Sequence, residues 1–507
     1  MLGTINILRV IIAVTLVLSP ALVWLVSGVA PPFAQRGVTE FPTLGAIIGP
    51  DNEAREQLAD AFADRSLARK GAIGLLNTIK WRVFGFIDDD RIVSGNDGVL
   101  FYKQQFSEWS CERREINAVS LDRMLFFSEL ASVADVDFVI AIAPNKASVL
   151  REAVTGLAGA YVGCYDETES RLRTIVSNAP EGSIIDHTPP MQAAADRASL
   201  FFRTDTHWTT NGGVRALNQF FDETGTTFGP GFLAATPRSI LRTPDLASSM
   251  LQIPMLESDI AYNFAPRLVE RSEVQHQTVL HDSFYARIRD ALSAGFWQSD
   301  FVYINRSPES DLISALERSS SVVLQRVERR LLAEFQSNGV LSHDGRLLQW
   351  LIDRNSEAAA HNCVYDDNLE FDDVELRRVE GTTLAALRVI SDDPILIFSA
   401  PEYSGQYASC LRFSLASTGN VSLRLYFPGA RFARLYGPYS EGRVLEFNGN
   451  DEISVELMLP PLTQTEVRLD PTTETGDFQV TNLAYGRVLA EVLSDEREPV
   501  SEIDLRP

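Results

Sequence analysis

Apolar positions in the middle of the chain alternate between two periodicities. Leu121, Leu125, Phe126 and Leu130 recur at helical spacing, which predicts a helix over 120–134. The continuously apolar run that follows is typical of a strand buried in a parallel sheet. A second helix is expected over 146–154, and strands are expected at 137–144, 183–186, 278–280, 301–304 and 321–327. This pattern predicts an α/β layer fold with a mostly parallel sheet, in which chemistry gathers beyond the carboxyl ends of the strands.

Beyond about Gly339 the pattern changes to short alternating strands separated by Gly and Pro turns, which is typical of an antiparallel β-sandwich. The expected strands cover 385–390, 395–399, 410–414, 421–426, 453–457, 465–469 and 478–480. The run Val467-Arg468-Leu469-Asp470-Pro471 resembles a signature of β-sandwich modules attached to glycan-processing enzymes. Four aromatic residues either belong to the core of this sandwich or form a surface that stacks on sugars: Tyr426, Phe432, Tyr436 and Tyr439.

The N-terminus carries an apolar, uncharged run from Val10 to Ala30. About 20 such residues can span a bilayer, so we expect an uncleaved signal anchor with the bulk of the chain outside the cytoplasm. A cleaved signal peptide is the alternative, although Pro31 and Pro32 follow the small residues at once. The expected organisation is a membrane-spanning helix in 1–35, an α/β domain in 36–340 and a β-sandwich in 341–507.

Composition and charge narrow the classes of partner. The 507 residues suggest two or three domains, and the formal net charge of −23 argues against nucleic acid, because phosphate binding needs a basic face. The simplest pairing of the four cysteines outside the cytoplasm joins Cys111 to Cys164 and Cys363 to Cys410. Buried free thiols are the alternative.

Two separated segments carry residues suited to acyl transfer. Asp205 and His207 stand two positions apart, which in an extended segment puts both on one face, and Ser283 follows the apolar strand of 278–280. Together they supply a nucleophile, a general base and an orienting acid. Each also has a structural interpretation, since Ser283 could cap the next helix and Asp205 with His207 could be a hydrogen-bonded pair beneath Trp208.

Two other groups of histidine and aspartate are weaker candidates for a functional site. A metal site could combine His276 and His281 with Asp282, but that spacing fits no common metal motif. His187 beside Asp186 is interpreted as structural.

Four ordered blocks between about Val93 and Arg330 resemble the periplasmic alginate O-acetyltransferase family, whose catalytic domain is SGNH-hydrolase-like. The blocks are Ser94-Gly95-Asn96-Asp97-Gly98-Val99-Leu100-Phe101-Tyr102, Ala143-Pro144-Asn145-Lys146-Ala147-Ser148, Thr204-Asp205-Thr206-His207-Trp208 and Asp282-Ser283-Phe284. Asp and His precede Ser, as in that family's permuted arrangement. Val99 replaces the family's usual Trp and His281 its usual Gly, and His281 could alter the turn that presents Ser283.

The resemblance implies a three-layer SGNH-hydrolase-like domain, a trailing β-sandwich and a polysaccharide O-acetyltransferase of the periplasm. Ser283 would be the nucleophile, His207 the general base and Asp205 the group that orients it. The Ser283 amide would be one oxyanion donor, with Asn305 a candidate for the second. No cofactor or metal is expected. The implied partners are the polysaccharide, a membrane-bound O-acyltransferase as acetyl donor, and the inner membrane through the N-terminal helix. A carbohydrate esterase and a glycan-binding scaffold without catalysis remain alternatives.

Overall fold

The structure is a computed structural model of the whole chain. It describes residues 39–488 except 49–51, 66, 88, 157, 226–230, 267–275, 297, 305, 337–345, 366–373, 376–386, 391–395, 400–407, 429–438, 462–465 and 474–476. The predicted span of Val10–Ala30 therefore lies outside the described residues, as does the predicted boundary near residue 340. Within the described part, none of the helices has the length and apolar character needed to cross a membrane.

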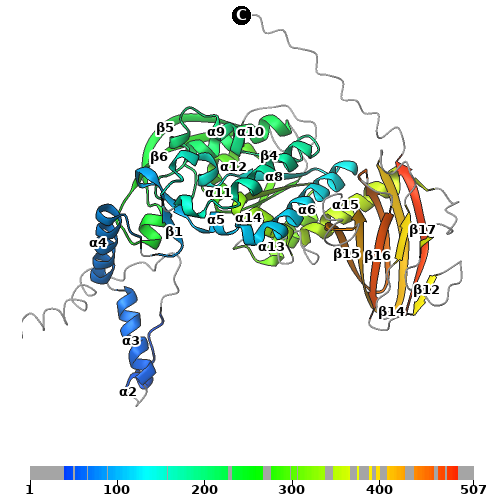
Figure 1. The fold of residues 1–507 in the computed structure, drawn as a ribbon, viewed down its shortest axis with the longest axis horizontal. Coiled ribbons are helices and arrows are strands. Elements are labelled where there is room, and N and C mark those ends of the chain that lie inside the picture. The colour runs from blue at the N-terminus through cyan, green and yellow to red at the C-terminus, as the bar shows by residue number, and fades with distance from the viewer. Residues whose placement is uncertain are drawn as a thin grey trace, which may run out of the picture.

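A five-stranded parallel sheet forms the centre of the first two thirds of the chain (Figure 1). Its strands, in spatial order, are β4 (Ile184–Asp186), β3 (Phe138–Ala143), β9 (Ser321–Val327), β7 (Gln277–His281) and β8 (Ser299–Tyr303). Every neighbouring pair is parallel. All residues of β3 and β9 are buried. β3 is accordingly apolar throughout, whereas β9 also buries Ser321, Gln325 and Arg326. The predicted α/β fold with a parallel sheet is confirmed.

Helices cover both faces of this sheet. Crossovers between parallel strands are right-handed, and the β7–β8 and β8–β9 connections run in opposite directions across the sheet. Their helices, α12 (Arg289–Gly295) and α13 (Glu309–Arg318), therefore lie on opposite faces. α15 (Arg346–Asn362) contacts α13 and α6 (Arg114–Val133), and α6 contacts α8 (Tyr165–Asn178), so these four helices form one layer.

Several elements differ from the sequence expectation. The helix expected over 146–154 is two short pieces, α7 (Lys146–Val149) and the 3-10 turn η3 (Arg151–Ala153), because Leu150 leaves the helical conformation. α15 occupies a region expected to be β-rich, and it buries Leu347, Leu351 and Trp350 against the α/β domain. The remaining elements of this part are α2 (Leu44–Ile48), α3 (Asn52–Arg65), α4 (Leu67–Phe84), β1 (Ile92–Ser94), β2 (Leu100–Tyr102), α5 (Gln104–Ser107), α9 (Thr188–Gln192), α10 (Thr210–Thr224), β5 (Phe232–Arg242), the π-helical segment η6 (Asp245–Met250), β6 (Glu257–Pro266), α11 (Ser283–Ala286) and α14 (Glu328–Leu331).

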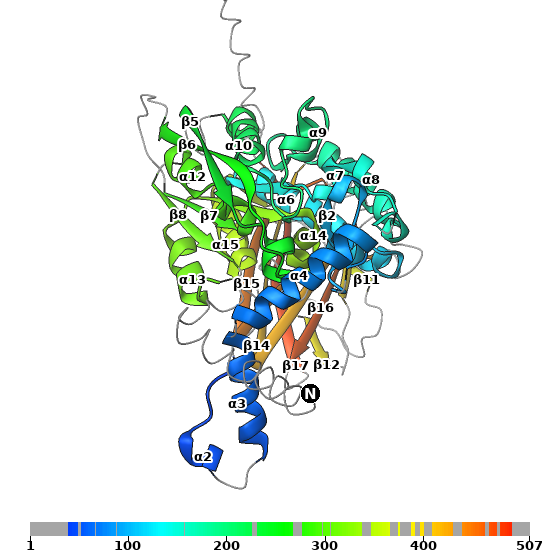
Figure 2. The same ribbon diagram turned by 90° about the vertical axis from the view of Figure 1, so that its left-hand side faces the viewer.

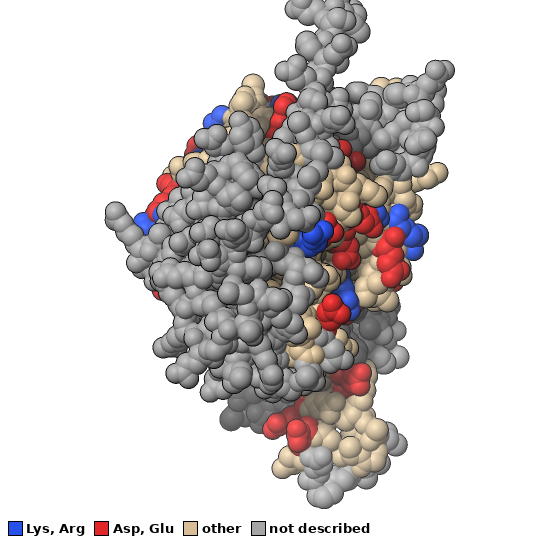
Figure 3. Space-filling model, turned by 90° about the vertical axis from the view of Figure 1, so that its right-hand side faces the viewer, with Lys and Arg blue, Asp and Glu red and all other residues tan. Residues whose placement is uncertain are grey.

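The C-terminal region is built from antiparallel strands, at the right of Figure 1. They are β10 (Cys363–Tyr365), β11 (Val374–Glu375), β12 (Leu387–Ile390), β13 (Leu396–Ser399), β14 (Ser409–Pro428), β15 (Tyr439–Leu459), β16 (Glu466–Thr473) and β17 (Asp477–Val488). β14 pairs with β15 along most of its length, whereas its other edge pairs first with β17 and then with β16. This confirms the predicted β-rich region. On the end of the molecule shown in Figure 3, the described charged side chains include both signs.

One buried side chain joins the two regions. The Asn355 side chain on α15 donates to the carbonyl oxygens of Leu130 on α6, at 2.9 Å, and of Met458 on β15, at 3.0 Å. Its own oxygen accepts from the Met458 amide at 2.8 Å. Nearby, the Phe126 and Phe427 rings pack with their centroids 5.2 Å apart. The C-terminal strands are therefore held against the α6–α15 layer by buried contacts.

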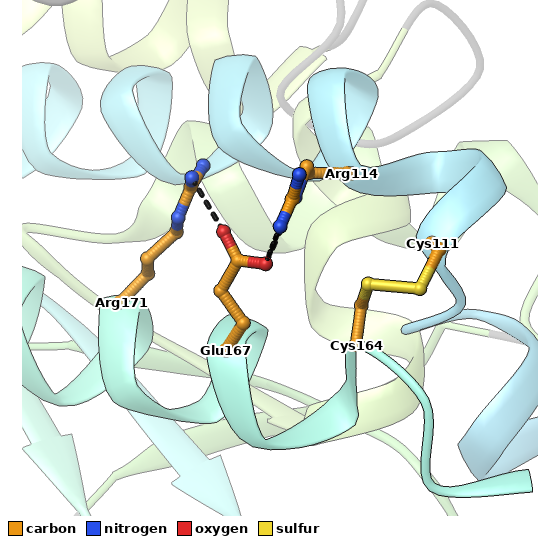
Figure 4. The surroundings of a disulfide bond; sticks show 5 residues. All are labelled: Cys111, Arg114, Cys164, Glu167 and Arg171. Carbon is orange, nitrogen blue, oxygen red and sulfur yellow. Dashed lines mark hydrogen bonds and ion pairs between the residues drawn. A yellow bond between two sulfur atoms is a disulfide. The ribbon is translucent and has the colours of Figure 1, made fainter.

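Both predicted disulfides are present, and they pair all four cysteines. Figure 4 shows that Cys111–Cys164 joins the chain just before α6 to the chain at the start of α8. Glu167 on α8 accepts hydrogen bonds from Arg114 of α6 and from Arg171 one turn further along α8. The second bridge, Cys363–Cys410, links β10 to β14. Disulfides of this kind persist in oxidising compartments.

Candidate functional site

Asp205 and His207 lie in a bent loop rather than in the extended segment expected from the sequence. The loop is closed by an antiparallel bridge between Phe201 and Trp208. One carboxylate oxygen of Asp205, Oδ1, accepts from the backbone amide of His207 at 2.9 Å and from its Nδ1 at 2.6 Å. Asp side chains favour such turns because they can accept from the backbone two residues later. The spacing of two residues is therefore explained by a turn that fixes the ring as well as the backbone.

Trp208 attaches this loop to the segment that carries Ser283. Its indole N–H donates to the Phe284 carbonyl at 3.0 Å, and the two rings pack edge to face with centroids 5.1 Å apart. Gly213 lets α10 approach closely from behind, because a Cβ there would lie 2.5 Å from the Ile288 side chain and 3.1 Å from the Trp208 indole nitrogen. The buried Trp208 ring thus fixes the distance between two segments that are remote in sequence.

Ser283 is the first residue of α11, directly beyond the carboxyl end of β7. The cap of this short helix is Asp282 and not Ser283, because Asp282 Oδ1 accepts from the Phe284 amide at 2.8 Å. The other oxygen of Asp282 accepts from the Val327 amide at the end of β9, also at 2.8 Å. The Ser283 hydroxyl is thereby left free of a capping role. Asp282 holds the turn between the ends of two neighbouring parallel strands.

The three residues singled out in the sequence come together here. His207 Nε2 lies 2.8 Å from Ser283 Oγ, while its Nδ1 faces Asp205. Asp205 is buried, His207 is 8 % exposed and Ser283 is half-buried. The hydrogen bonds therefore run from a buried carboxylate through an imidazole to a hydroxyl at the surface. Such a relay can deprotonate the hydroxyl and stabilise the imidazolium that results.

Two residues that the sequence analysis missed complete the surroundings of Asp205. Arg287 Nη2 donates to Asp205 Oδ2 at 3.0 Å, and the Asp245 backbone amide donates to the same oxygen at 2.9 Å. Burial raises the pKa of Asp205, but the hydrogen bonds and charge of His207, together with the charge of Arg287, outweigh it and lower the pKa well below its usual range. Asp205 is therefore ionised at neutral pH.

Asp245 brings a second carboxylate to the same imidazole. Its Oδ1 accepts from the Thr206 amide at 2.7 Å, its Oδ2 accepts from the Thr206 hydroxyl, and Oδ2 lies 3.5 Å from His207 Nδ1. Burial and the negative charge of Asp205 raise the pKa of Asp245. Arg287, four residues after Ser283, could have been found from helical spacing. Asp245 lies 40 residues from Asp205 and carries no local signal.

Two cations lie beside this relay. Lys146 is buried, and its Nζ donates to the carbonyl oxygens of Leu100 and Arg203; burial lowers its pKa to about 8. Arg329, just beyond β9, has its guanidinium 5.5 Å from the centre of the Phe284 ring and donates to Asn145. Burial lowers the pKa of Arg329. Through these contacts Lys146, in the second sequence block, binds the first block at Leu100 and the residue just before the third block, Arg203.

The histidines away from the relay do not form the metal site considered from the sequence. His276 precedes β7 and pairs with Asp300, whereas His281 ends β7, stacks on Tyr303 and donates to the Asp282 carbonyl. The His281 ring packs on Tyr303, and the turn that presents Ser283 is held by the Asp282 carboxylate. His187 is fully buried between Gln219 and Tyr285, and burial lowers its pKa to about 4. Asn305 lies outside the described residues.

Within the described residues, the side chains with metal-ligand geometry are Asp205, His207 and Asp245. The guanidinium of Arg287 already occupies this cluster, since it bonds Asp205 and lies 3.4 Å from His207 Nδ1. A fixed positive charge at that place opposes a metal cation. The donor set therefore suits proton transfer better than metal binding.

In the C-terminal strands, Arg468 and Asp470 alternate with the buried Val467 and Leu469, so the Arg-Leu-Asp-Pro run is an ordinary strand with one buried face. Arg468 is ion-paired with Asp470 and lies over the half-buried Tyr426 ring, 5.1 Å from its centre. Phe432 and Tyr436 lie outside the described residues, as does the side chain of Tyr439. The sugar-stacking surface stays a prediction.

A comparison with known protein families matches one segment of the α/β domain. Residues 92–244 match the family described as "ALGX: SGNH hydrolase-like domain, acetyltransferase AlgX". This confirms the family resemblance of the first three sequence blocks. The matched range includes Asp205 and His207 and ends before Asp245 and the block of Ser283. No curated protein matches the chain significantly.

The solved structures that the chain matches include the O-acetyltransferase domain of Pseudomonas putida AlgJ, at 18 % identity and a TM-score of 0.37 over 52 % of this chain and 98 % of that one. Pseudomonas aeruginosa AlgX has 13 % identity and a TM-score of 0.31, covering 80 % and 98 %. Bacillus cereus PatB1 has 14 % identity and a TM-score of 0.33, covering 48 % and 97 %.

Proposed function

We propose that this chain is an O-acetyltransferase that moves an acetyl group through Ser283 onto hydroxyls of an exported polysaccharide. The observation that carries the proposal is the relay in which His207 joins a surface hydroxyl to a buried, ionised carboxylate. The family match over residues 92–244 supports the acetyltransferase class. The two disulfides support a site of action outside the cytoplasm.

The first half of the reaction acetylates the enzyme. Ser283 Oγ attacks the acetyl carbonyl of the donor while His207 Nε2 takes the hydroxyl proton, and a C–O bond forms. The imidazolium is stabilised by Asp205 on its other nitrogen. When the tetrahedral intermediate collapses, the bond to the donor's leaving oxygen breaks and His207 returns the proton to that oxygen. The Ser283 amide, which has no acceptor among the described residues, supports the negative oxygen of the intermediate.

The second half transfers the group. A sugar hydroxyl takes the place of the donor, His207 removes its proton, and the hydroxyl oxygen attacks the acetyl-serine carbonyl. Collapse releases the acetylated sugar and returns the proton to Ser283 Oγ. The predicted donor is a membrane-bound O-acyltransferase, the periplasm is the proposed compartment, and the apolar run at the N-terminus is the proposed link to the inner membrane. The C-terminal β-rich region is proposed to hold the polymer.

A transfer assay on the full chain tests this function. The donor is a chromogenic acetyl ester, the acceptors are neutral and uronic oligosaccharides, and the products are read by mass spectrometry. We expect acetylated oligosaccharide from the wild type and from Ser293→Ala, a control at an exposed serine on α12, but none from Ser283→Ala. Ester cleavage without transfer would favour the esterase. Transfer that survives in Ser283→Ala would overturn the proposed nucleophile.

A further inference from the structure

Helix α4 is attached to the α/β domain by one face only. Trp81 on this face is buried in a cluster with Leu246 and Leu251, and the Asn77 side chain donates to the Leu251 carbonyl at 2.7 Å. Gly74 completes the contact, because a Cβ at that position would lie 2.2 Å from the Gln252 carbonyl oxygen. Figure 2 shows α4 lying across the face of the molecule that is turned to the viewer.

The opposite face of α4 is apolar and open to solvent. Leu75 is 63 % exposed, Leu76 50 %, Ile79 41 % and Val83 69 %. Successive residues of a helix are rotated by about 100°, which places these four on one stripe, roughly opposite the buried residues. At the C-terminal end of the helix, Phe84 and Phe86 add further exposed apolar surface, at 73 % and 52 % exposed. These six residues are called the α4 stripe below. Contiguous exposed apolar residues on a soluble domain mark a surface that is covered by something else.

The charge of α4 is opposite to that of the chain. The helix contains four basic residues and no acidic one, whereas the whole chain has a net charge of −23. By the same rotation, Arg82 and Lys80 leave the helix on either side of the first four residues of the α4 stripe. The Arg82 guanidinium lies over the Trp81 ring, 4.1 Å from its centre, and the Lys80 ammonium lies 5.8 Å from the centre of the Phe86 ring. Long cationic side chains at the edges of an apolar stripe can reach anionic headgroups while their stems stay in the apolar layer. This distribution is typical of helices that lie in a membrane interface.

We propose that the α4 stripe lies on the surface of an anionic lipid bilayer. The position in the chain agrees with this occupant, because the apolar run Val10–Ala30 precedes α4 and lies outside the described residues. An anionic membrane repels a protein with a net negative charge, so binding to it needs a local basic surface such as α4. The proposal goes beyond the acetyltransferase function and does not depend on it.

The proposal has a consequence for the position of the relay. Trp81 of α4 packs against Leu246, and Leu246 follows Asp245, whose carboxylate lies beside His207. A bilayer in contact with α4 would therefore lie next to the segment that carries Asp245. The relay would be held close to the membrane surface, where a membrane-bound acetyl donor presents its group.

Depth-dependent quenching in the full chain tests the proposal. All variants carry Trp24→Phe, which removes the tryptophan of the N-terminal apolar run. Leu75→Trp places a probe on the α4 stripe, and Leu241→Trp on β5 is a matched control, since Leu241 is 64 % exposed. The proteins are reconstituted into phosphatidylcholine vesicles with and without phosphatidylglycerol, using lipids brominated in the acyl chains. An interfacial helix buries its apolar face about 5–10 Å into the boundary, within reach of such quenchers.

We expect the probe at position 75 to lose roughly half of its added emission in vesicles that contain phosphatidylglycerol, whereas the probe at 241 keeps its emission. Replacing Lys80→Glu and Arg82→Glu together should abolish the quenching at 75. No quenching at 75, equal quenching at both positions, or equal quenching without phosphatidylglycerol would each overturn the proposal. If the protein self-associates in detergent and the probe at 75 is not quenched by lipid, the α4 stripe would be assigned to contact with a second copy of the chain instead.

Discussion

Asp245 Oδ2 lies 3.5 Å from Nδ1 of His207, the same ring nitrogen that donates to Asp205. The imidazole is thus flanked by two carboxylates on one side and faces Ser283 on the other. The arrangement is asymmetric, since Asp205 accepts the hydrogen bond whereas Asp245 is held by Thr206 and contributes mainly charge. This relationship suggests that Asp245 is a positioning residue for the proposed reaction.

Substituting Asp245→Asn should slow acetyl transfer at neutral pH. The amide can keep both contacts with Thr206, but it removes a negative charge that favours the imidazolium formed during the reaction. We expect kcat to fall roughly tenfold, about 1.4 kcal/mol of the barrier, with KM little changed. The measurement is a rate profile over pH with the chromogenic ester, beside Asp290→Asn on the exposed part of α12. Equal profiles for wild type and Asp245→Asn would show that the charge plays no part.

The same substitution should change stability in a pH-dependent way. Burial and Asp205 raise the pKa of Asp245 in the folded state above the ordinary value of about 3.9. Because the folded pKa is raised, protonated Asp245 stabilises the folded state relative to ionised Asp245. This stabilisation is complete below about pH 4 and is lost as the pH rises through the pKa of Asp245 in the folded protein. Relative to wild type, Asp245→Asn should therefore gain thermal stability between weakly acidic and neutral pH. Melting temperatures measured from pH 4 to 8 check this; a constant difference would contradict it.

Asp282→Ala should damage both folding stability and the relay. Its carboxylate accepts two buried backbone amides, of Phe284 and Val327, and both would lose their acceptor. We expect a loss of about 2–4 kcal/mol in the free energy of unfolding, together with slower ester cleavage, because the turn that presents Ser283 loosens. Urea unfolding and ester kinetics measure the two effects, with Asp290→Ala as control. A variant as stable and as active as wild type would show that the turn is held by other contacts.

Asn355→Leu should weaken the attachment of the C-terminal strands. The substitution leaves the Leu130 and Met458 carbonyls and the Met458 amide without this partner in a buried interface. We expect about 2–4 kcal/mol of destabilisation and, in calorimetry, a separation of the transitions of the two regions. Asn178→Leu, at an exposed position of α8, is the matched control. A single unshifted transition would rule out this role for Asn355.

The five strands of the parallel sheet and the helix over 120–134 could be predicted because the burial of each segment is reflected in its own sequence. A strand buried on both faces must be apolar throughout, as in β3, and a strand buried on one face must alternate, as in Val467 to Asp470. The helix α15 was missed, because its sequence lies beside the strand-rich region and its burial depends on α6 and α13, which are distant in sequence. Local periodicity carries no information about such a neighbour.

The sequence by itself determined the parallel sheet and the blocks that bear Asp205, His207 and Ser283. The structure decided between the simplest pairing of the cysteines and free thiols. Only the tertiary structure decided that Asp205 and His207 share a turn and that Asp282 rather than Ser283 caps α11. It also brought Asp245, Arg287 and Lys146 to one imidazole and its loop. The physical reason is that hydrogen bonds and charges act over a few ångströms in space, whereas the chain separates these groups by tens of residues. Which distant groups meet is set by how the helices and strands pack.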